Sequence, residues 1–253
     1  MNDARLKLRF DGKVARLVFR RAEKLNALDA AMVDALVPLC RQIERSDARV
    51  VILTGKGKSF WAGGDIAAWS VLSPQAFRMQ WLRAGLQAFD TLARLRQPWI
   101  AVLNGHCLGR GRVLAACADL RIAKAHVKIG LPEPGLGIIL GWSGAQRLNG
   151  RFGAPTARRM ALMAGVLNPG QAQVHGSGDQ VVPTAEGLGA AQILADRVLS
   201  RAFGNRSDKN ADQQRQRRKA GARRRHPRWR LCRRFSGLAK GLAAFRAQRK
   251  PQF

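Results

Sequence analysis

The chain has 253 residues, of which 46% are apolar and 24% are charged, and its formal net charge is +29. A chain of this length and composition can bury a sizeable core, which excludes a wholly disordered protein. Its longest apolar runs are much shorter than the roughly 20 residues that cross a bilayer, and its N-terminus lacks the pattern of a secretory leader. We therefore expect a cytoplasmic protein with no membrane partner.

Cysteine usage agrees with that compartment. The four cysteines show neither CxxC pairing nor the spacing of zinc ligands. Reduced thiols are the rule in a cytosol. We expect no disulfide, no metal site and no redox cofactor.

Positive charge is densest near the C-terminus. Residues 201–236 hold 14 Lys or Arg side chains and two acidic ones, a net of +12, and no acidic residue follows Asp212. Residues 203–236 also lack helical periodicity. The chain thus divides into a body, residues 1–200, and a C-terminal region, residues 201–253, of different composition.

The body opens with a hairpin signal, because two alternating segments, 6–10 and 14–19, flank an Asp-Gly pair. Apolar residues at helical spacing predict a helix over 30–45. The run VVILTG, residues 50–55, is almost entirely apolar and ends at a glycine. It predicts a strand that is buried on both faces.

Loops, helices and strands alternate from there. SFWAGGDI and GLPEPGLG are predicted loops, WIAVLNG is a second buried strand and DLRIA is a short strand. Helices are predicted over 75–95, over 111–117 and after Pro155. This alternation indicates an α/β fold with a largely parallel sheet. Ligands gather where the strands of such sheets end, so we expect the glycine-rich segments 59–66 and 104–111 to share one site.

Five blocks of the body stand in a characteristic order: KLNALDAAM, SFWAGGDI, PWIAVLNGHCLGRG, DLRIA and IGLPEPGLGIILGWSGAQRL. In order and spacing they resemble the successive motifs of the enoyl-CoA hydratase/isomerase (crotonase) family. The ending GLAAFRAQRKPQF, within residues 237–253, resembles the family's C-terminal motif. The resemblance implies a crotonase-like ββα spiral core in residues 1–200, followed by a C-terminal helical region that looks degenerate here.

The implied reaction centre stabilises an enolate next to a thioester carbonyl. Preorganised N–H groups suit that task because they hold the developing oxyanion without rearrangement. By the resemblance, the donors are the backbone N–H groups of Gly64 and Arg110, and Glu133 is the acid/base. The implied substrate is an acyl-CoA thioester, and no separate cofactor is implied.

The resemblance also implies where coenzyme A lies. The implied contacts are Lys24, Leu25, Ala62, Gly64, Asp65, Ile66, Leu108 and Phe245. The first two would lie near its ribose and phosphates, and Ala62, Gly64 and Ile66 near its adenine end. Phe245 would reach the coenzyme A of another subunit, because the resemblance implies a homotrimer or a hexamer built from two trimers.

One proton-transfer position departs from the family's pattern. The resemblance implies that a hydratase of this family uses two glutamates. Val113 occupies the position of the first one here, and a valine cannot transfer a proton. A single carboxylate can move a proton between two carbons and so shift a double bond, whereas adding water ordinarily needs a second group. We therefore expect isomerisation rather than hydration, with activity that is reduced or lost.

Arg110 stands where the family has small residues. We expect its side chain to obstruct the pocket beside the enolate oxygen. The alternative is that it neutralises a phosphate or a carboxylate of the substrate. Trp61, Arg112 and Leu140 also replace residue types that the family prefers.

Two interpretations of residues 203–236 stay open. Family-like sequence resumes after them, which favours a stretch that is read out of frame between two compensating shifts in the gene. Alternatively, this Arg-rich segment, with Trp229 and His226 interleaved, binds RNA through phosphate contacts and stacking, although charge runs are more often solvated tails. A nonenzymatic acyl-CoA binder is a third interpretation of the whole chain.

Overall fold

The computed structural model describes residues 3–138, 140–200, 243–244, 246–247 and 249. The out-of-frame and RNA-binding interpretations of residues 203–236 lie outside the described residues. So does the predicted coenzyme A contact Phe245.

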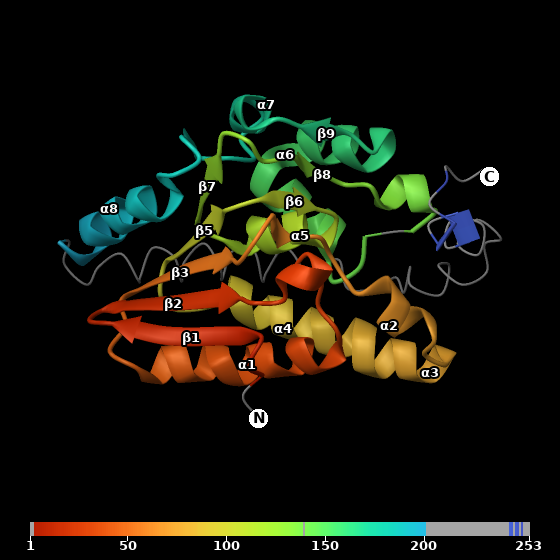
Figure 1. Ribbon diagram of the computed structural model, residues 1–253, viewed down its shortest axis with the longest axis horizontal. Coiled ribbons are helices and arrows are strands. Elements are labelled where there is room, and N and C mark those ends of the chain that lie inside the picture. The colour runs from red at the N-terminus through yellow and green to blue at the C-terminus, as the bar shows by residue number, and fades with distance from the viewer. Residues whose placement is uncertain (1–2, 139, 201–242, 245, 248, 250–253) are drawn as a thin grey trace.

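A six-stranded sheet forms the centre of the body, in the order β1-β2-β3-β5-β7-β10 (Figure 1). Its strands are β1 (Leu6–Asp11), β2 (Val14–Phe19), β3 (Val50–Gly55), β5 (Trp99–Leu103), β7 (Leu120–Lys124) and β10 (Gln180–Val182). The hairpin β1-β2 is antiparallel, and every other neighbouring pair is parallel. The predicted hairpin, the two buried strands and the α/β architecture are therefore confirmed.

Alternate residues of β3 show why its sequence is almost entirely apolar. Val51 and Leu53 belong to the larger apolar core, which includes residues of α1 (Ala30–Arg45) and α4 (Ala84–Ala93). Val50 and Ile52 belong to a smaller core on the other face, which α8 (Gly187–Leu199) covers. Because both faces of the strand are covered, no position of β3 remains for a polar side chain that faces water.

A second, four-stranded sheet runs in the order β4-β6-β8-β9. Its strands are β4 (Ser59–Trp61), β6 (His106–Leu108), β8 (Ile129–Gly130) and β9 (Val166–Leu167). The loop prediction for SFWAGGDI was wrong for its first three residues, which form β4, and that for GLPEPGLG was wrong at Gly130, which belongs to β8. Strands of two or three residues carry too short an alternation to be read from sequence, and pairing with distant segments defines them.

The remaining described helices lie between the two sheets and around them. They are η1 (Ala22–Lys24), α2 (Ile66–Ser70), α3 (Pro74–Ala76), the π-helix η2 (Phe77–Arg83), α5 (Arg110–Cys117), η3 (Glu133–Leu136), α6 (Gly144–Met163) and α7 (Pro169–Val174). The helix predicted over 75–95 is present, but its middle is the π-helix. Helix α6 starts before the predicted position and bends at Gly153, which has a φ of +80°.

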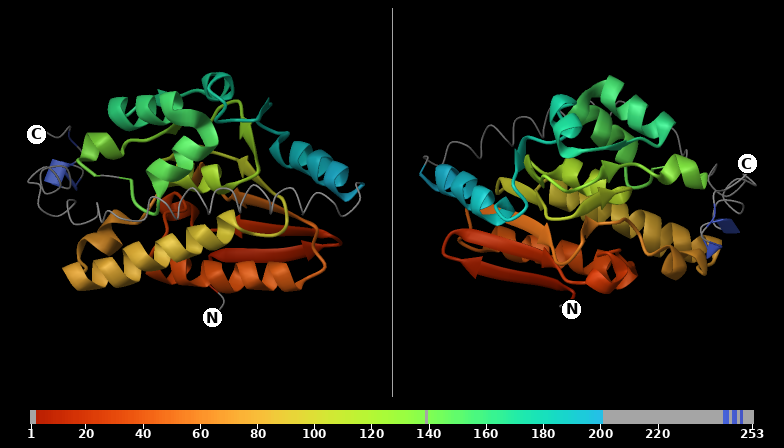
Figure 2. Two further views of the ribbon diagram at one scale, coloured as in Figure 1. Left: turned by 180° about the vertical axis from the view of Figure 1, so that it is seen from behind. Right: turned by 45° about the horizontal axis from the view of Figure 1, so that its top comes forward.

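Helix α6 connects two sides of the molecule. Figure 2 shows α7 and the C-terminal part of α6 on the side away from α1 and α4, whereas the start of α6 reaches α4, where Arg147 pairs with Asp90. Near α2, Arg246 of the C-terminal motif donates from Nη2 to Ser70 Oγ at 3.1 Å. The described part of that motif therefore lies on the side of α2 and α3.

Candidate functional site

Two glycine-rich turns meet beside α5. One turn follows β4 and contains Gly63 and Gly64, and Gly64 forms an isolated bridge with Leu28. The other contains Gly109, which has a φ of +58° and precedes the first residue of α5, Arg110. A Cβ atom on Gly63 would lie 3.7 Å from the backbone nitrogen of Arg110. The structure thus brings the two turns together, as predicted from their place after strands.

Glu133 lies against the second turn. A Cβ atom on Gly109 would lie 2.7 Å from Glu133 Oε1, so a larger residue at 109 would displace the carboxyl group. Among the residues that the structure describes, Glu133 is the only buried acidic one, and its Oε2 has no hydrogen-bond partner. Burial raises the pKa of Glu133, while a backbone hydrogen bond and the charge of Arg110 lower it in part. A buried carboxyl group with an uncommitted oxygen can exchange a proton with a ligand.

Val113 lies one helical turn after Arg110 and is fully buried. A Cβ atom on Gly144 of α6 would lie 2.9 Å from Val113 Cγ2, so the valine packs against the start of α6. The side chain at this position therefore contributes packing and no proton-transfer group.

The side chain of Arg110 fills space beside Gly64. Its Nη1 would lie 3.1 Å from a Cβ atom on Gly64, and its Nη2 3.3 Å from one on Gly141. Its Cζ lies 5.7 Å from the ring centroid of Trp81 and 4.9 Å from that of Trp142. The cation is 7% exposed and is held by indole faces, which attract cations through their quadrupole.

The two tryptophans are fixed by unusual backbone. Trp81 comes from the π-helix η2, and a Cβ atom on Gly64 would overlap its ring. Trp142 has a φ of +56°, a backbone conformation that is energetically unfavourable for a residue with a side chain of this size. Its Nε1 donates to the carbonyl of Trp81 at 3.0 Å, and its ring occupies space that only a glycine at position 85 leaves open. We call Arg110, Trp81 and Trp142 the arginine clamp.

Trp81 and Trp142 were not predicted from the sequence as site residues. The available signal was Arg110 itself, because a buried guanidinium needs partners. Nothing local in the sequence says that those partners come from about 30 residues on either side.

Most of the predicted coenzyme A contacts form one rim beside the first turn. Lys24 ends η1, and Leu25 follows it with a φ of 51° and a side chain that is 48% exposed. The carbonyl of Leu25 accepts from the N–H of Ala62 at 3.1 Å. Asp65 caps α2 and pairs with Arg21 at 2.8 Å, and Ile66 is the first residue of α2. Leu108 ends β6, immediately before the second turn.

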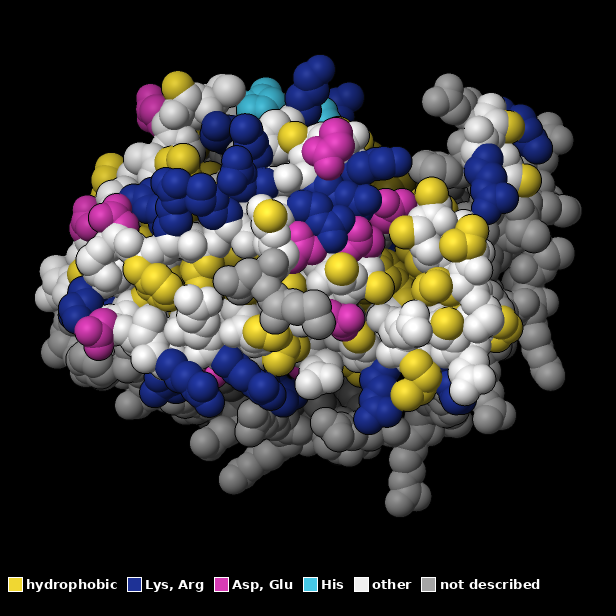
Figure 3. All heavy atoms as spheres, turned by 60° about the horizontal axis from the view of Figure 1, so that its bottom comes forward, with side chains coloured by type: hydrophobic (Ala, Val, Ile, Leu, Met, Phe, Trp, Pro, Cys, Tyr) yellow, Lys and Arg dark blue, Asp and Glu magenta, His cyan; other side chains and the backbone are white. Residues whose placement is uncertain are grey.

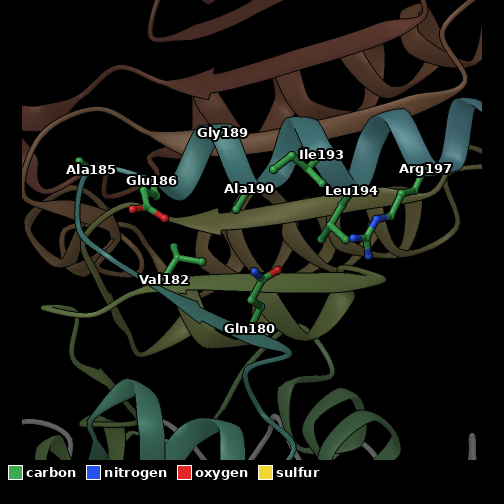
Figure 4. A pocket seen from close by; sticks show the side chains of 9 residues that line it. All are labelled: Gln180, Val182, Ala185, Glu186, Gly189, Ala190, Ile193, Leu194 and Arg197. Carbon is green, nitrogen blue, oxygen red and sulfur yellow. The ribbon is translucent and has the colours of Figure 1, made fainter.

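A cavity of about 490 Å³ lies elsewhere, between β10 and α8 (Figure 4). It is lined by Gln180, Val182, Ala185, Glu186, Gly189, Ala190, Ile193, Leu194 and Arg197. None of the predicted site residues lines it, and its side chains include neither a nucleophile nor a buried acid. We therefore assign the candidate site to the two turns and not to this cavity.

Lys and Arg side chains form several groups on the face shown in Figure 3, as the high net charge leads one to expect. Within the described part of the chain, no three His, Cys, Asp or Glu side chains come together as metal ligands. No described helix has the length and apolar character that crossing a bilayer requires.

Comparison with known proteins adds independent findings. A family model described as enoyl-CoA hydratase/isomerase matches residues 9–253. A short-chain-enoyl-CoA hydratase of Clostridium acetobutylicum is 34% identical over 194 residues, which are 76% of this chain and 74% of that protein. A crotonyl-CoA hydratase of Syntrophomonas wolfei is 36% identical over 191 residues, 75% of this chain and 73% of that protein. The crystal structure of an enoyl-CoA hydratase from Bacillus anthracis superimposes with a TM-score of 0.79 at 27% identity and covers 98% of both chains.

Proposed function

The chain belongs to the enoyl-CoA hydratase/isomerase family, as its motifs predicted, and from this premise we propose that it shifts the double bond of short-chain enoyl-CoA thioesters. The proposal rests on the position of Glu133. It is the only buried acidic residue among the described residues, and it lies next to the turn that leads to the Arg110 N–H. The short acyl chain is suggested by the names of the two relatives.

The proposed reaction uses the two turns as the oxyanion site. The backbone N–H groups of Gly64 and Arg110 would hold the thioester oxygen as the enolate forms. Glu133 would take a proton from C2 of a 3-enoyl-CoA and return it to C4, which moves the double bond into conjugation with the carbonyl. One carboxyl group suffices because the proton leaves and returns on the same base.

Hydration would need a further group to activate water, and Val113 cannot serve. We therefore expect the purified protein to convert 3-enoyl-CoA to 2-enoyl-CoA faster than it hydrates 2-enoyl-CoA. Absorbance of the conjugated thioester follows both reactions. Hydration as fast as isomerisation, abolished by Glu133→Gln, would contradict the single-carboxyl mechanism.

Val113→Glu sharpens this test, with Val113→Gln as its matched control. The glutamate supplies a second ionisable group, and the glutamine has the same length without a proton to transfer. We expect the ratio of hydration to isomerisation to rise only in Val113→Glu. A rise of the same size in both variants would assign the change to altered packing.

A second candidate function, binding of acyl-CoA without turnover, is favoured by the arginine clamp. Its guanidinium and the Trp81 ring fill the space where a Cβ atom on Gly64 would lie, beside the proposed oxyanion site. Binding of butyryl-CoA by calorimetry together with no detectable isomerisation would select this candidate. We also propose that the full chain forms a trimer or a hexamer, as the resemblance to the family implies. Sedimentation of the full chain tests this.

A further inference from the structure

Arg112 is a buried cation that the proposed reaction does not use. It lies two residues after Arg110 on α5, and its side chain is 1% exposed. Its Cζ lies 5.0 Å from the ring centroid of Phe152 on α6. Among the described residues, neither its Nε nor its Nη2 has a hydrogen-bond partner. Two buried donors on a charged group without acceptors call for an explanation, such as a bound ion.

A second arginine approaches the same ring from β7. Arg121 Cζ lies 5.4 Å from the ring centroid of Phe152. Arg121 pairs with Asp179 at 2.5 Å and donates from Nη1 to the carbonyl of Ala118 at 3.0 Å. Its Nε also has no partner among the described residues. Three guanidinium N–H donors from two chain segments are thus buried near one aromatic ring.

The charges of this cluster do not balance. Burial lowers the pKa of Arg112 to about 10; the Cys107 thiol opposes this shift and the neighbouring Arg121 adds to it, so Arg112 is cationic at neutral pH. Burial raises the pKa of Cys107 to about 12, so its thiol is neutral. Asp179 offsets the charge of Arg121. One positive charge remains.

We propose that Arg112 and Arg121 bind a small monovalent inorganic anion, such as chloride, beside Phe152. One negative charge neutralises the excess, and three N–H donors can coordinate it. Water would satisfy donors but not the charge. Cys107 is fully buried and Phe152 is only 8% exposed, so we expect the site to admit a small ion and to exclude a bulky organic anion.

The experiment measures the thermal midpoint of the full chain in sodium chloride and in sodium gluconate at equal ionic strength. Gluconate is too large for the site. With a dissociation constant of about 10 mM, 200 mM chloride raises the midpoint by about 4 °C over gluconate, because the anion binds only the folded state. Equal midpoints in the two salts overturn the proposal.

Two variants separate the site from the protein's general positive charge. Arg112→Leu keeps most of the side-chain volume and removes the donors, so its midpoint is the same in both salts. Arg158→Leu removes a cation from the exposed face of α6 and keeps the full chloride effect. A chloride effect of the same size in Arg112→Leu assigns it to the surface and overturns the proposal.

A crystal of the unmodified chain gives a readout that does not depend on a folded variant. Crystals grown in sodium bromide and measured at the bromine absorption edge show an anomalous peak within hydrogen-bond distance of Arg112 Nε. An ordered Arg112 without such a peak overturns the proposal.

Discussion

Arg110 and Arg112 are both buried on α5, but their surroundings differ. Residues two apart on a helix point to nearly opposite sides, so Arg110 faces the glycine turns and Arg112 faces α6 and β7. Arg110 lies between two indoles and lowers the pKa of a nearby carboxyl group, Glu133. Arg112 faces one phenyl ring and a second cation. The neighbours of a buried arginine, more than its burial, therefore decide whether it acts on a ligand or needs one.

The largest expected effect comes from removing the carboxyl group on the Arg110 side. Glu133→Gln should lower the isomerisation rate by about 10²- to 10⁴-fold, the usual contribution of a positioned acid/base. Affinity for butyryl-CoA should change little, because the side chain keeps its size. Stopped-flow absorbance and calorimetry measure the two quantities. A variant with unchanged turnover would remove Glu133 from the mechanism.

Emptying the arginine clamp should produce the next largest effect. Arg110→Gly keeps the backbone N–H and removes the guanidinium that an acyl chain must displace from two indole faces. Each of the two cation–π contacts is worth about 0.5 to 2 kcal/mol, so affinity for butyryl-CoA should rise by about 5- to 700-fold. Arg158→Ala on the surface of α6 is the control. Weaker binding by Arg110→Gly would instead support the alternative that Arg110 neutralises a group of the substrate.

Removing the buried cation on the other side of α5, Arg112, should change the stability of the folded protein. In buffer without chloride, Arg112→Leu should raise the free energy of unfolding by about 1 to 4 kcal/mol, because an apolar side chain replaces an uncompensated buried charge. Urea titration measures this. The gain should shrink as chloride is added to both proteins. A variant that is less stable than the parent in every salt would mean that Arg112 already has its partners.

The smallest effect concerns pH. Burial raises the pKa of Glu133 above its ordinary 4.5, so the acid limb of the isomerisation profile should have its midpoint above 4.5. Arg110→Gly should move that midpoint higher, because the guanidinium lowers the pKa of Glu133. The stability that Glu133 contributes is full below pH 4.5 and is lost as pH rises through its raised pKa. Glu133→Gln should lack this pH dependence in urea titrations.

The sequence predicted those parts of the fold whose pattern is long enough to repeat. The spacing of apolar residues in Ala30–Arg45 and the almost entirely apolar run Val50–Gly55 specify a helix and a buried strand by themselves. The two glycine turns were also predictable as one site, because the carboxyl ends of parallel strands meet at one edge of a sheet. Arg110 was expected to obstruct the pocket, but its side-chain contacts depend on Trp142, whose backbone conformation no sequence pattern announces.

The π-helix η2 makes the arginine clamp sensitive to chain length rather than to composition. Helix α4 is held in place by its buried residues, so its rotation about its axis is fixed. Each backbone hydrogen bond of a π-helix spans five residues instead of the four of an α-helix, so a short π-segment holds one extra residue. Deleting a single residue between Trp81 and Gly85 would restore α-helical spacing and turn Trp81 by about 100° about the axis. One codon lost at this point would therefore take an indole away from Arg110 while every residue type of the site stayed the same.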